Sequence, residues 1–545
     1  MTGRPNVIVI LVDDMGYSDI GCYGGEIPTP NLDRLAAGGV RLSQFYNTAR
    51  CSPSRASLLT GLHPHQTGIG ILTEDQRPYG YPGTLNDRCV TLAEVLGAGG
   101  YATYMSGKWH LCGQVDRPHD AWPTRRGFDR FFGTLTGAGN YWNPGTLTRD
   151  ETPVEDHELE PGFFYTDAIG AAAADFVTSH STGDDAGRPF FLYTAFTAPH
   201  WPLHALEEDI EAMRGRYAEG WDVLRERRAD RLVDLGVLEA GWNLSDRDPD
   251  VKPWNDTANQ NWEQRRMEVY AAQVHRMDAA VGRIVAALEA TGHLDDTVLM
   301  FLSDNGGCAE NLEPGWTDEL ENRPIHLPAH TRAGGRVFRG NTPAVVPGAE
   351  DTYASYGTAW ANLSNTPFRE YKHWVHEGGI ATPFIVHWPA GRLAPGTVRH
   401  DPHQLPDVMA TVLDVTGVDH PSGRASGRDG RDVLPPEGVS MLRTWHGDGR
   451  RDSVAEPEHT LYWEHEGNAA VRQGRWKLVR KFGQDWELYD LDVDRTELND
   501  VAGRHPGLVD RLGSAYAAWA GRCGVVPREQ ILARRTAGTA GPAGD

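Results

Sequence analysis

The chain has 545 residues, of which 39% are hydrophobic and 23% charged, and its formal net charge is −23. This length predicts more than one structural unit, and the acidic balance argues against nucleic acid or an anionic membrane surface as a partner. The longest apolar run near the start, residues 7–12, is too short to span a membrane, and no signal peptide is visible before it. We therefore expect a cytoplasmic protein with no membrane partner.

Short apolar runs predict the core strands. Because they are almost continuously apolar, they are typical of strands buried on both faces of a parallel sheet. The runs are residues 6–12, 102–105, 189–197, 297–302 and 383–388. Helical patterns at 32–37 and 267–290 lie between them. This alternation predicts an α/β fold with a large, mostly parallel sheet sandwiched by helices.

The remaining segments predict the domain organisation of the chain. We expect a catalytic domain over residues 1–450, with a charged helical insertion at about 205–264 and a substrate loop at about 308–365. A linker at 421–451 precedes runs at 461–464, 470–480 and 486–491 and a helical pattern at 506–519. These predict a C-terminal α+β subdomain over 451–535 that contains an antiparallel sheet, followed by a disordered tail at 536–545.

The run Cys51-Ser52-Pro53-Ser54-Arg55 indicates an oxyanion site. Ser52 is a suitable helix cap, with Pro53 at the first helical position. The free N–H groups at such a helix start favour an anion and lower the pKa of a thiol placed there. The planar cation of Arg55 suits sulfate or phosphate.

Polar side chains follow several of the predicted strands. In an open parallel sheet, ligands bind beyond the carboxyl ends of the strands, so these residues are expected to meet in one site. They are Asp13, Asp14, Lys108, His110, His200, Asp304 and Asn305, with Lys372 just before the last strand. The carboxylate and amide oxygens among them suit Ca²⁺, or less well Mg²⁺. In isolation, the acidic pairs would be strand-end turns and the two histidines core residues.

Together these motifs resemble the type I, formylglycine-dependent sulfatase family of the alkaline phosphatase superfamily, most closely the bacterial arylsulfatases. The resemblance runs from residue 6 to about 520 and rests on the run at Cys51 and on three further motifs. These are Gly107-Lys108-Trp109-His110, Ala198-Pro199-His200 and Ser303-Asp304-Asn305-Gly306, with Lys372 ahead of Glu377-Gly378-Gly379. The resemblance implies an alkaline-phosphatase-like catalytic domain that binds one Ca²⁺.

The resemblance also implies a mechanism. A maturing enzyme would oxidise Cys51 to formylglycine, whose hydrate would attack the sulfur of a small sulfate ester, aryl sulfates being expected. Asp13, Asp14, Asp304, Asn305 and position 51 would bind the metal, and Asp304 would accept the proton of the nucleophile. Arg55, Lys108 and Lys372 would neutralise the sulfate oxygens, and His200, with Lys372, would assist the departing alcohol or phenol. His110 would then release sulfate from a sulfated enzyme.

Three other functions are compatible with parts of this pattern. A phosphate or phosphonate monoester hydrolase shares the metal site and sometimes the modified cysteine. A cysteine phosphatase would use the thiolate directly, but its arginine stands six positions after the cysteine rather than four, and it needs no acidic cluster. A non-catalytic oxyanion- or Ca²⁺-binding protein would leave Cys51 unmodified. The sequence does not identify the natural substrate or the oligomeric state.

Overall fold

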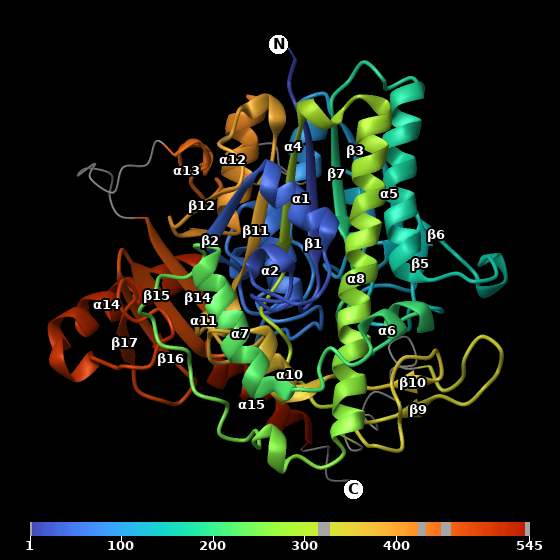
Figure 1. Cartoon of the computed structure of the whole chain (residues 1–545). Helices are drawn as coiled ribbons and strands as arrows, with labels where there is room; N and C mark the ends of the chain where they lie inside the picture. The colour runs from blue at the N-terminus through green and yellow to red at the C-terminus, as the bar shows by residue number, and fades with distance from the viewer. Residues whose placement is uncertain (1–2, 314–327, 423–431, 448–458, 540–545) are drawn as a thin grey trace, which may run out of the picture.

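The computed structural model describes residues 3–313, 328–422, 432–447 and 459–539. A large mixed sheet with helices on both faces forms the body of the molecule, and a four-stranded antiparallel sheet lies beside it (Figure 1). This arrangement confirms the predicted fold class. Across the described residues, no helix is both long and apolar enough to cross a membrane.

The large sheet has eleven strands in the order β12-β2-β11-β8-β1-β7-β3-β4-β5-β6, with β13 also paired to β2. Their bounds are β1 (Asn6–Val12), β2 (Val40–Tyr46), β3 (Ala102–Gly107), β4 (Arg130–Thr134), β5 (Leu147–Arg149), β6 (Thr152–Pro153), β7 (Phe190–Ala195), β8 (Thr297–Ser303), β11 (Ala381–His387), β12 (Thr397–Arg399) and β13 (His403–Gln404). In the centre, β8, β1, β7 and β3 pair in parallel, so their carboxyl ends share one edge.

Several strands differ from the sequence-based expectation. The outer strands β4, β5, β6, β12 and β13 were not predicted, nor was β2, whose residues are all buried and include Arg41, Ser43 and Gln44. Polar side chains interrupt the apolar pattern of β2 and contact distant segments: Arg41 donates to the carbonyl oxygen of Cys22 at 2.7 Å, and the Ser43 hydroxyl lies 2.7 Å from Nδ1 of His400. The other difference is that β11 runs antiparallel to both β2 and β8. Its amino end, preceded by Lys372, therefore lies at the edge where the parallel strands finish.

Helices cover both faces of this sheet. The helices are α1 (Pro30–Gly38), α2 (Cys51–Thr60), α3 (Pro64–Thr67), α4 (Leu92–Ala98), α5 (Tyr165–Thr182), α6 (Glu207–Met213), α7 (Gly220–Asp234), α8 (Gln260–Thr291), α10 (Gly357–Ser364), α11 (Glu377–Ile380), α12 (Pro406–Thr416), α13 (Leu442–His446), α14 (Pro506–Cys523) and α15 (Arg528–Thr539). On one face α1, α5 and α8 pack against the sheet, and on the other α2, α4 and α12 do so.

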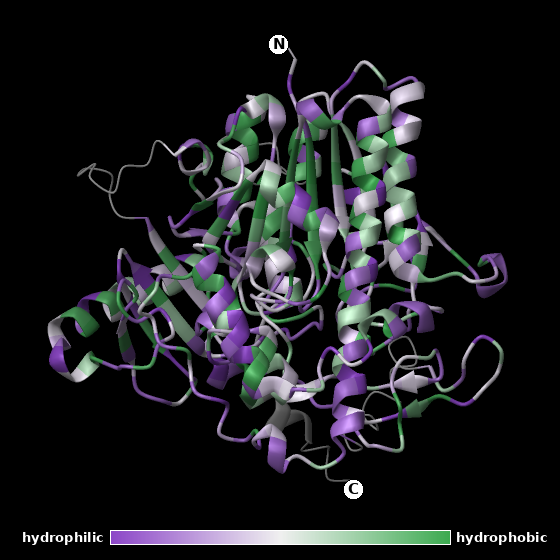
Figure 2. Cartoon of the chain, in the orientation of Figure 1, coloured by the Kyte–Doolittle hydropathy of each residue, from purple (hydrophilic) through white to green (hydrophobic). Residues whose placement is uncertain are grey.

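Alternate side chains of β1 enter the two cores. Ile8 and Ile10 pack with α8 and α5, whereas Val7 and Val9 pack with α2 and α4. The central strands are accordingly apolar along their length, while α5 and α8 show polar residues on their outer sides (Figure 2). Burial on both faces holds the carboxyl ends of the strands on a rigid base.

The C-terminal sheet is the antiparallel meander that the sequence predicted. Its strands are β14 (Thr460–His465), β15 (Asn468–Gln473), β16 (Trp476–Arg480) and β17 (Glu487–Asp490). The predicted run 470–480 is two strands, because Gly474 turns the chain between them with a φ of 58°. One face of this sheet packs against α14, and the opposite face joins the main core through Leu461 and Trp463.

Several predicted segment bounds have only partial counterparts in the structure. The expected insertion at 205–264 contains α6, α7 and the start of α8, and the expected substrate loop at 308–365 contains two short strands, β9 (Phe338–Arg339) and β10 (Thr352–Tyr353), and α10. Residues 314–327, parts of the predicted linker (423–431 and 448–451) and the predicted boundary at 450 lie outside the described residues, whereas the described part of the linker contains α13. The sequence analysis missed α15, which runs to Thr539 and so overlaps the predicted tail; residues 540–545 are not described.

Candidate active site

The first turn of α2 holds Cys51 at the edge where the parallel strands end. The helix begins at Cys51 with Arg50 as its N-cap residue. The expectation that Ser52 caps the helix was therefore wrong: Ser52 lies inside the first turn, and its buried hydroxyl has no hydrogen-bond partner among the described residues. Pro53 is tolerated there because the first-turn N–H groups have no intrahelical acceptor.

His110 faces Cys51. Its Nδ1 lies 3.5 Å from the Cys51 sulfur. His110 follows β3 and adopts a left-handed backbone conformation with a φ of 55°. A Cβ added to Gly137 would lie 2.2 Å from Cε1 of the His110 ring, so only glycine leaves room for the ring in this position. The structure thus brings Cys51 and His110 together, as the sequence predicted.

Two cations are buried behind Cys51. Arg55 donates from Nε and Nη2 to one oxygen of Asp304, at 3.1 and 2.8 Å. Nζ of Lys108 donates to Oδ2 of Asp13 at 2.5 Å. The main-chain oxygen of Lys108 also accepts a hydrogen bond from Arg55 at 3.0 Å. The register that pairs Val12 with Ser303 places Asp13 and Asp304 next to each other.

Lys372, Asp14 and His200 form a second group. Nζ of Lys372 lies 2.8 Å from Oδ2 of Asp14 and 3.4 Å from Nε2 of His200. Nδ1 of His200 lies 2.6 Å from the carbonyl oxygen of Trp201, which can only accept, so the proton of the neutral ring sits on Nδ1. The unprotonated Nε2 therefore faces the ammonium group of Lys372.

Burial and neighbouring charges set the protonation of these groups. Burial lowers the pKa of His200 to about 3, although Asp14 opposes the shift. Burial disfavours ionised Asp14, but Lys372 and the hydrogen bond from Asn305 are among the interactions that together outweigh burial, and the pKa falls to about 2. Burial, and then the charge of Asp13, raise the pKa of Asp304 to about 7. At neutral pH His200 is therefore neutral and Asp14 is ionised.

The oxygen atoms of this cluster fit a hard divalent cation. Oδ1 of Asp13 and Oδ1 of Asn305 are buried and have no hydrogen-bond partner among the described residues. Leaving a buried acceptor unsatisfied costs on the order of 1–3 kcal/mol, so two in one cluster indicate a missing partner. Asp14 and Asp304 add carboxylate oxygens beside them: Asn305 donates to Asp14 at 2.7 Å, and the Asp14 N–H donates to Asp304 at 3.2 Å.

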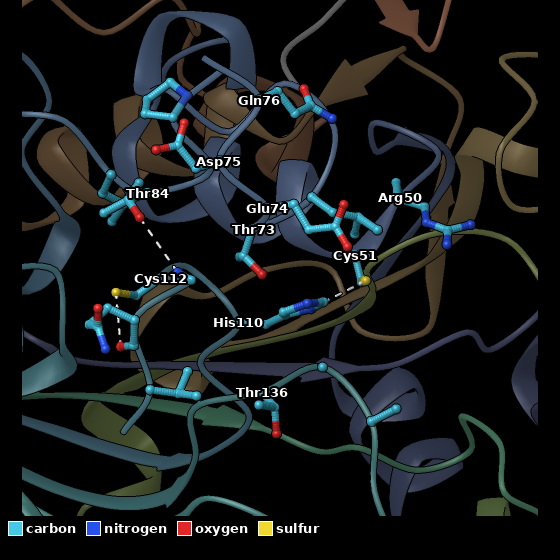
Figure 3. A pocket seen from close by; sticks show the side chains of 18 of the residues that line it. Arg50, Cys51, Thr73, Glu74, Asp75, Gln76, Thr84, His110, Cys112 and Thr136 are labelled. Carbon is cyan, nitrogen blue, oxygen red and sulfur yellow. Dashed lines mark hydrogen bonds between the residues drawn. The ribbon is translucent and has the colours of Figure 1, made fainter. Parts of the chain in front are cut away.

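A cavity of about 1330 Å³ opens onto the cluster. Cys51, His110, His200 and Lys372 line it, and Figure 3 shows the segment around Thr73–Gln76 passing over Cys51 and His110. Asp13, Asp14, Arg55, Lys108, Asp304 and Asn305 lie behind this wall and are fully or almost fully buried. All the predicted site residues thus lie in one cluster.

Three linked residues beside Cys51 and His200 were not predicted as site residues. Oε1 of Glu310 accepts from Arg50 at 2.8 Å and its Oε2 accepts from the Trp201 indole at 2.9 Å. Arg50, Trp201 and Glu310 all line the cavity. Arg50 and Trp201 directly adjoin Cys51 and His200 in the sequence, and Glu310 lies in the predicted substrate loop, but no motif singles out any of the three.

The amino-acid sequence matches two family models. The model described as "Sulfatase" matches residues 5–418, and the model described as "N-sulphoglucosamine sulphohydrolase, C-terminal" matches residues 369–508. Neither match extends beyond residue 508, so α15 lies outside both.

Curated relatives carry sulfatase names. An uncharacterized sulfatase of Schizosaccharomyces pombe is 34% identical, with 99% of this chain and 98% of that protein covered. An arylsulfatase of Klebsiella aerogenes is 35% identical, with 80% of this chain and 91% of that protein covered. A steryl-sulfatase of Mus musculus is 29% identical, with 87% of this chain and 69% of that protein covered.

Solved structures share the fold. Ps i-CgsB in complex with k-i-k-neocarrahexaose has a TM-score of 0.64 at 24% identity, covering 95% of this chain and 93% of its own. The phosphonate monoester hydrolase of Agrobacterium radiobacter has a TM-score of 0.54 at 19% identity, covering 96% of each chain. Given the family match over residues 5–418 and the full-length relatives, the chain belongs to the sulfatase family of sulfuric ester hydrolases.

Proposed function

We propose that the protein hydrolyses monoesters of sulfate with phenols, and that position 51 supplies the nucleophile after a maturing enzyme has converted Cys51 to formylglycine. The observation that carries this proposal is the 3.5 Å approach of His110 to the Cys51 sulfur at the wall of the cavity, directly in front of Arg55 and the acidic cluster. A helix start and buried cations together favour a tetrahedral oxyanion at this point.

Asp13, Asp14, Asp304 and Asn305 would hold one divalent cation, which we propose to be Ca²⁺. Four side chains with oxygen donors and no thiolate suit Ca²⁺ better than a softer metal. When bound, the cation would polarise the sulfate group and stabilise negative charge that develops on its oxygens. Arg55, Lys108 and Lys372 add fixed positive charge around the same position, and their hydrogen bonds to carboxylates hold them there before substrate binds.

His110 is placed to accept a proton from the side chain at position 51. Its Nδ1 is the ring atom that faces position 51, and Gly137 leaves room for the ring. A general base must lie within hydrogen-bond distance of the group whose proton it removes, about 2.6–3.2 Å between the two heavy atoms. A somewhat longer distance is usual before substrate binds.

Lys372, rather than His200, is the proton donor on the leaving-group side. His200 is neutral at physiological pH and turns its unprotonated Nε2 toward the ammonium group of Lys372. Lys372 remains charged because Asp14, which lies 2.8 Å away, and further groups that include Glu310 together outweigh the effect of burial and raise its pKa. His200 thus orients Lys372, which donates a hydrogen bond or a proton to the departing oxygen.

A phenolic leaving group is supported by two observations. The Klebsiella relative, matched over 91% of its length, is named arylsulfatase. In this chain the Trp201 ring is held at the cavity by Glu310 and has its centroid 4.4 Å from that of His200. An aromatic face beside the leaving-group site offers a stacking surface for a ring.

The experiment that tests the proposal measures hydrolysis of an aryl sulfate and the matching aryl phosphate by matured enzyme under the same conditions. We expect the sulfate ester to have the higher kcat/KM by at least about tenfold. The reason is charge: a sulfate monoester is a monoanion, whereas a phosphate monoester is largely a dianion, and we expect the positive charge of the site to match the monoanion. A higher kcat/KM on the phosphate would instead assign the protein to the phosphate or phosphonate monoester hydrolases. The fold likeness to a phosphonate monoester hydrolase makes this the comparison to run first.

A further inference from the structure

The last helix of the chain reaches the active-site cavity. Arg528 and Ile531, both on α15, line the same cavity as Cys51, His110 and Lys372. In Figure 1, α15 lies well away from α14, on the side where the loops at the carboxyl ends of the large sheet gather. Neither the chemistry proposed for the site nor the family match accounts for this helix.

On one side, α15 holds a loop that forms part of the cavity wall. Ile531 is only 6% exposed and packs with Ile71 and Tyr81 in a small apolar cluster separate from the main cores. Just before the helix, the N–H of Val526 donates to the Tyr81 hydroxyl at 2.7 Å. Ile71 and Tyr81, near the two ends of the segment 71–82, are thus both held by residues at or just before α15.

On the other side, α15 is anchored to the C-terminal sheet. Arg528 forms an ion pair with Glu466 at 2.8 Å, at the turn between β14 and β15. The second oxygen of Glu466 lies 3.3 Å from Nδ1 of His373, the residue after Lys372. The helix therefore contacts both the segment 71–82 and the part of the C-terminal sheet that lies next to His373.

The segment 71–82 depends on this support. It contains no helix or strand, and its side chains supply a large share of the cavity lining. The lining residues are Leu72, Thr73, Glu74, Asp75, Gln76, Arg77 and Pro82. Its internal backbone hydrogen bonds form one turn at residues 76–81: the N–H of Gln76 donates to the oxygen of Tyr81 at 2.8 Å, and the N–H groups of Tyr79 and Gly80 donate to the oxygen of Gln76 at 3.0 and 2.9 Å. The placement of this turn on the cavity wall depends on what packs against it.

We propose that α15 determines substrate specificity: by fixing the segment 71–82, it limits the size of the leaving group that the cavity accepts. The inference rests on the proposed hydrolysis of aryl sulfates. Apart from Lys372, which lies ahead of α11 and β11, the groups assigned to the chemistry sit on α2 and at the ends of β1, β3, β7 and β8. These elements pack into the main cores and not into the apolar cluster of Ile531. Releasing α15 should therefore change substrate selection far more than the chemical step.

The test uses the full-length, matured and Ca²⁺-loaded enzyme with two phenolic sulfates, 4-methylphenyl sulfate and estrone 3-sulfate. Their phenols have similar acidity and differ mainly in size. In Ile531→Asp, which places a charge in the apolar cluster, we expect the ratio of kcat/KM for the large substrate to that for the small one to rise at least about fivefold. The kcat for the small substrate should stay within about twofold of the wild-type value. Glu529→Gln, an exposed change on the same helix, is the matched control.

Hydrogen exchange independently measures whether the variants loosen the segment 71–82. Peptides from 71–82 should exchange faster in Ile531→Asp and not in Glu529→Gln. If Ile531→Asp fails to fold, Ile531→Ala and Arg528→Ala loosen the two anchors separately and should raise the same ratio. An unchanged or lower ratio in any folded variant whose 71–82 segment exchanges faster would overturn the inference. Failure of the proposed function would look different, because the wild-type enzyme would then hydrolyse neither substrate.

Discussion

Arg55 donates from two nitrogens to a single oxygen of Asp304, at 3.1 and 2.8 Å, although 249 residues separate them in the sequence. Both side chains are fully buried. A guanidinium can hold a carboxylate in this way and still present its other N–H groups, whereas an ammonium group acts as a point charge. The pair fixes a cation behind Cys51 before any substrate arrives.

This pairing predicts that Arg55→Lys is not a conservative change. The charge is retained but the two hydrogen bonds that converge on one Asp304 oxygen are lost, so we expect kcat/KM for an aryl sulfate to fall by about 10²–10³-fold. Arg214→Lys, at an exposed arginine, is the control and should leave the rate unchanged. Wild-type kcat/KM in Arg55→Lys would show that the geometry of the guanidinium is not needed.

Replacement of Lys372 by alanine should affect the leaving-group step. Asp14 would lose the cation 2.8 Å away, and the departing oxygen would lose its proton donor. We expect kcat to fall by about 10²–10³-fold, and to fall more for sulfates of weakly acidic phenols than for those of strongly acidic ones. The slope of log kcat against phenol pKa measures this. An equal loss across the series would show that Lys372 binds sulfate without assisting departure; Lys252→Ala, at an exposed lysine, is the control.

Gly137→Ala should act through His110. The added Cβ would lie 2.2–2.7 Å from atoms of the His110 ring, so the ring must move away from position 51. A displacement of this kind costs on the order of 10²-fold in rate, and we expect kcat to fall at least tenfold with little change in KM. Gly187→Ala, where nothing lies within 4 Å of the added atom, provides the comparison. If Gly137→Ala works at the wild-type rate, His110 is not the base.

Removal of divalent cations should abolish activity and lower stability together. Asp13, Asp14 and Asp304 would lose their counter-ion, and two buried oxygens would again lack a partner. A ligand present at 100 times its Kd stabilises a protein by about 2.7 kcal/mol, so Tm should fall by several degrees after treatment with a chelator. We expect Ca²⁺ to restore both properties better than Mg²⁺. Full activity in enzyme shown by elemental analysis to be metal-free would contradict the assignment.

The C-terminal sheet should be attached to the catalytic body through Glu377. This buried carboxylate accepts from Lys477 at 2.9 Å and from Arg495 at 3.1 Å. Burial opposes its ionisation, but Lys477, Arg495 and Arg472 together outweigh burial and lower its pKa from 4.5 to about 2. Glu377→Gln leaves Lys477 with a second carboxylate, Glu497 at 2.8 Å, but removes the carboxylate that Arg495 faces. Because a buried cation then lacks its partner, we expect the free energy of unfolding to fall by about 3–5 kcal/mol.

The sign of the pH dependence follows from the lowered pKa. In the unfolded chain Glu377 takes up a proton near pH 4.5, whereas in the folded protein it resists until about pH 2. The stabilisation is therefore complete above pH 4.5 and is lost as the pH falls from 4.5 toward 2. Urea unfolding at several pH values measures it, with Glu529→Gln as the control. An equally steep loss of stability in Glu377→Gln over this range would assign the effect to other groups.

Much of the fold and of the candidate site could be predicted from the sequence, for identifiable reasons. Apolar runs such as 6–12 and 297–302 stand out because strands buried on both faces have no polar side, and the polar residues after them mark one sheet edge. In contrast, β2 was missed because Arg41, Ser43 and Gln44 interrupt its apolar pattern although all three are buried. Their burial depends on distant contacts, such as that of Arg41 with Cys22, which no local pattern reveals.

Other features depend on contacts between distant segments. The orientation of β11 is set by its pairing with β2 and β8, and the roles of Glu310 and α15 come from partners far along the chain. The start of α2 at Cys51 rather than after Ser52 is a difference of two residues, which capping preferences alone do not resolve.

The central claim is that position 51 works as formylglycine in sulfate-ester hydrolysis. The most direct test prepares the enzyme with graded amounts of the maturing enzyme, determines by peptide mass the fraction of chains in which Cys51 has become formylglycine, and measures the rate of sulfate release per chain from an aryl sulfate. The account predicts a rate proportional to that fraction, with almost no activity when every chain retains the thiol. Full activity in chains whose Cys51 is unmodified would contradict it.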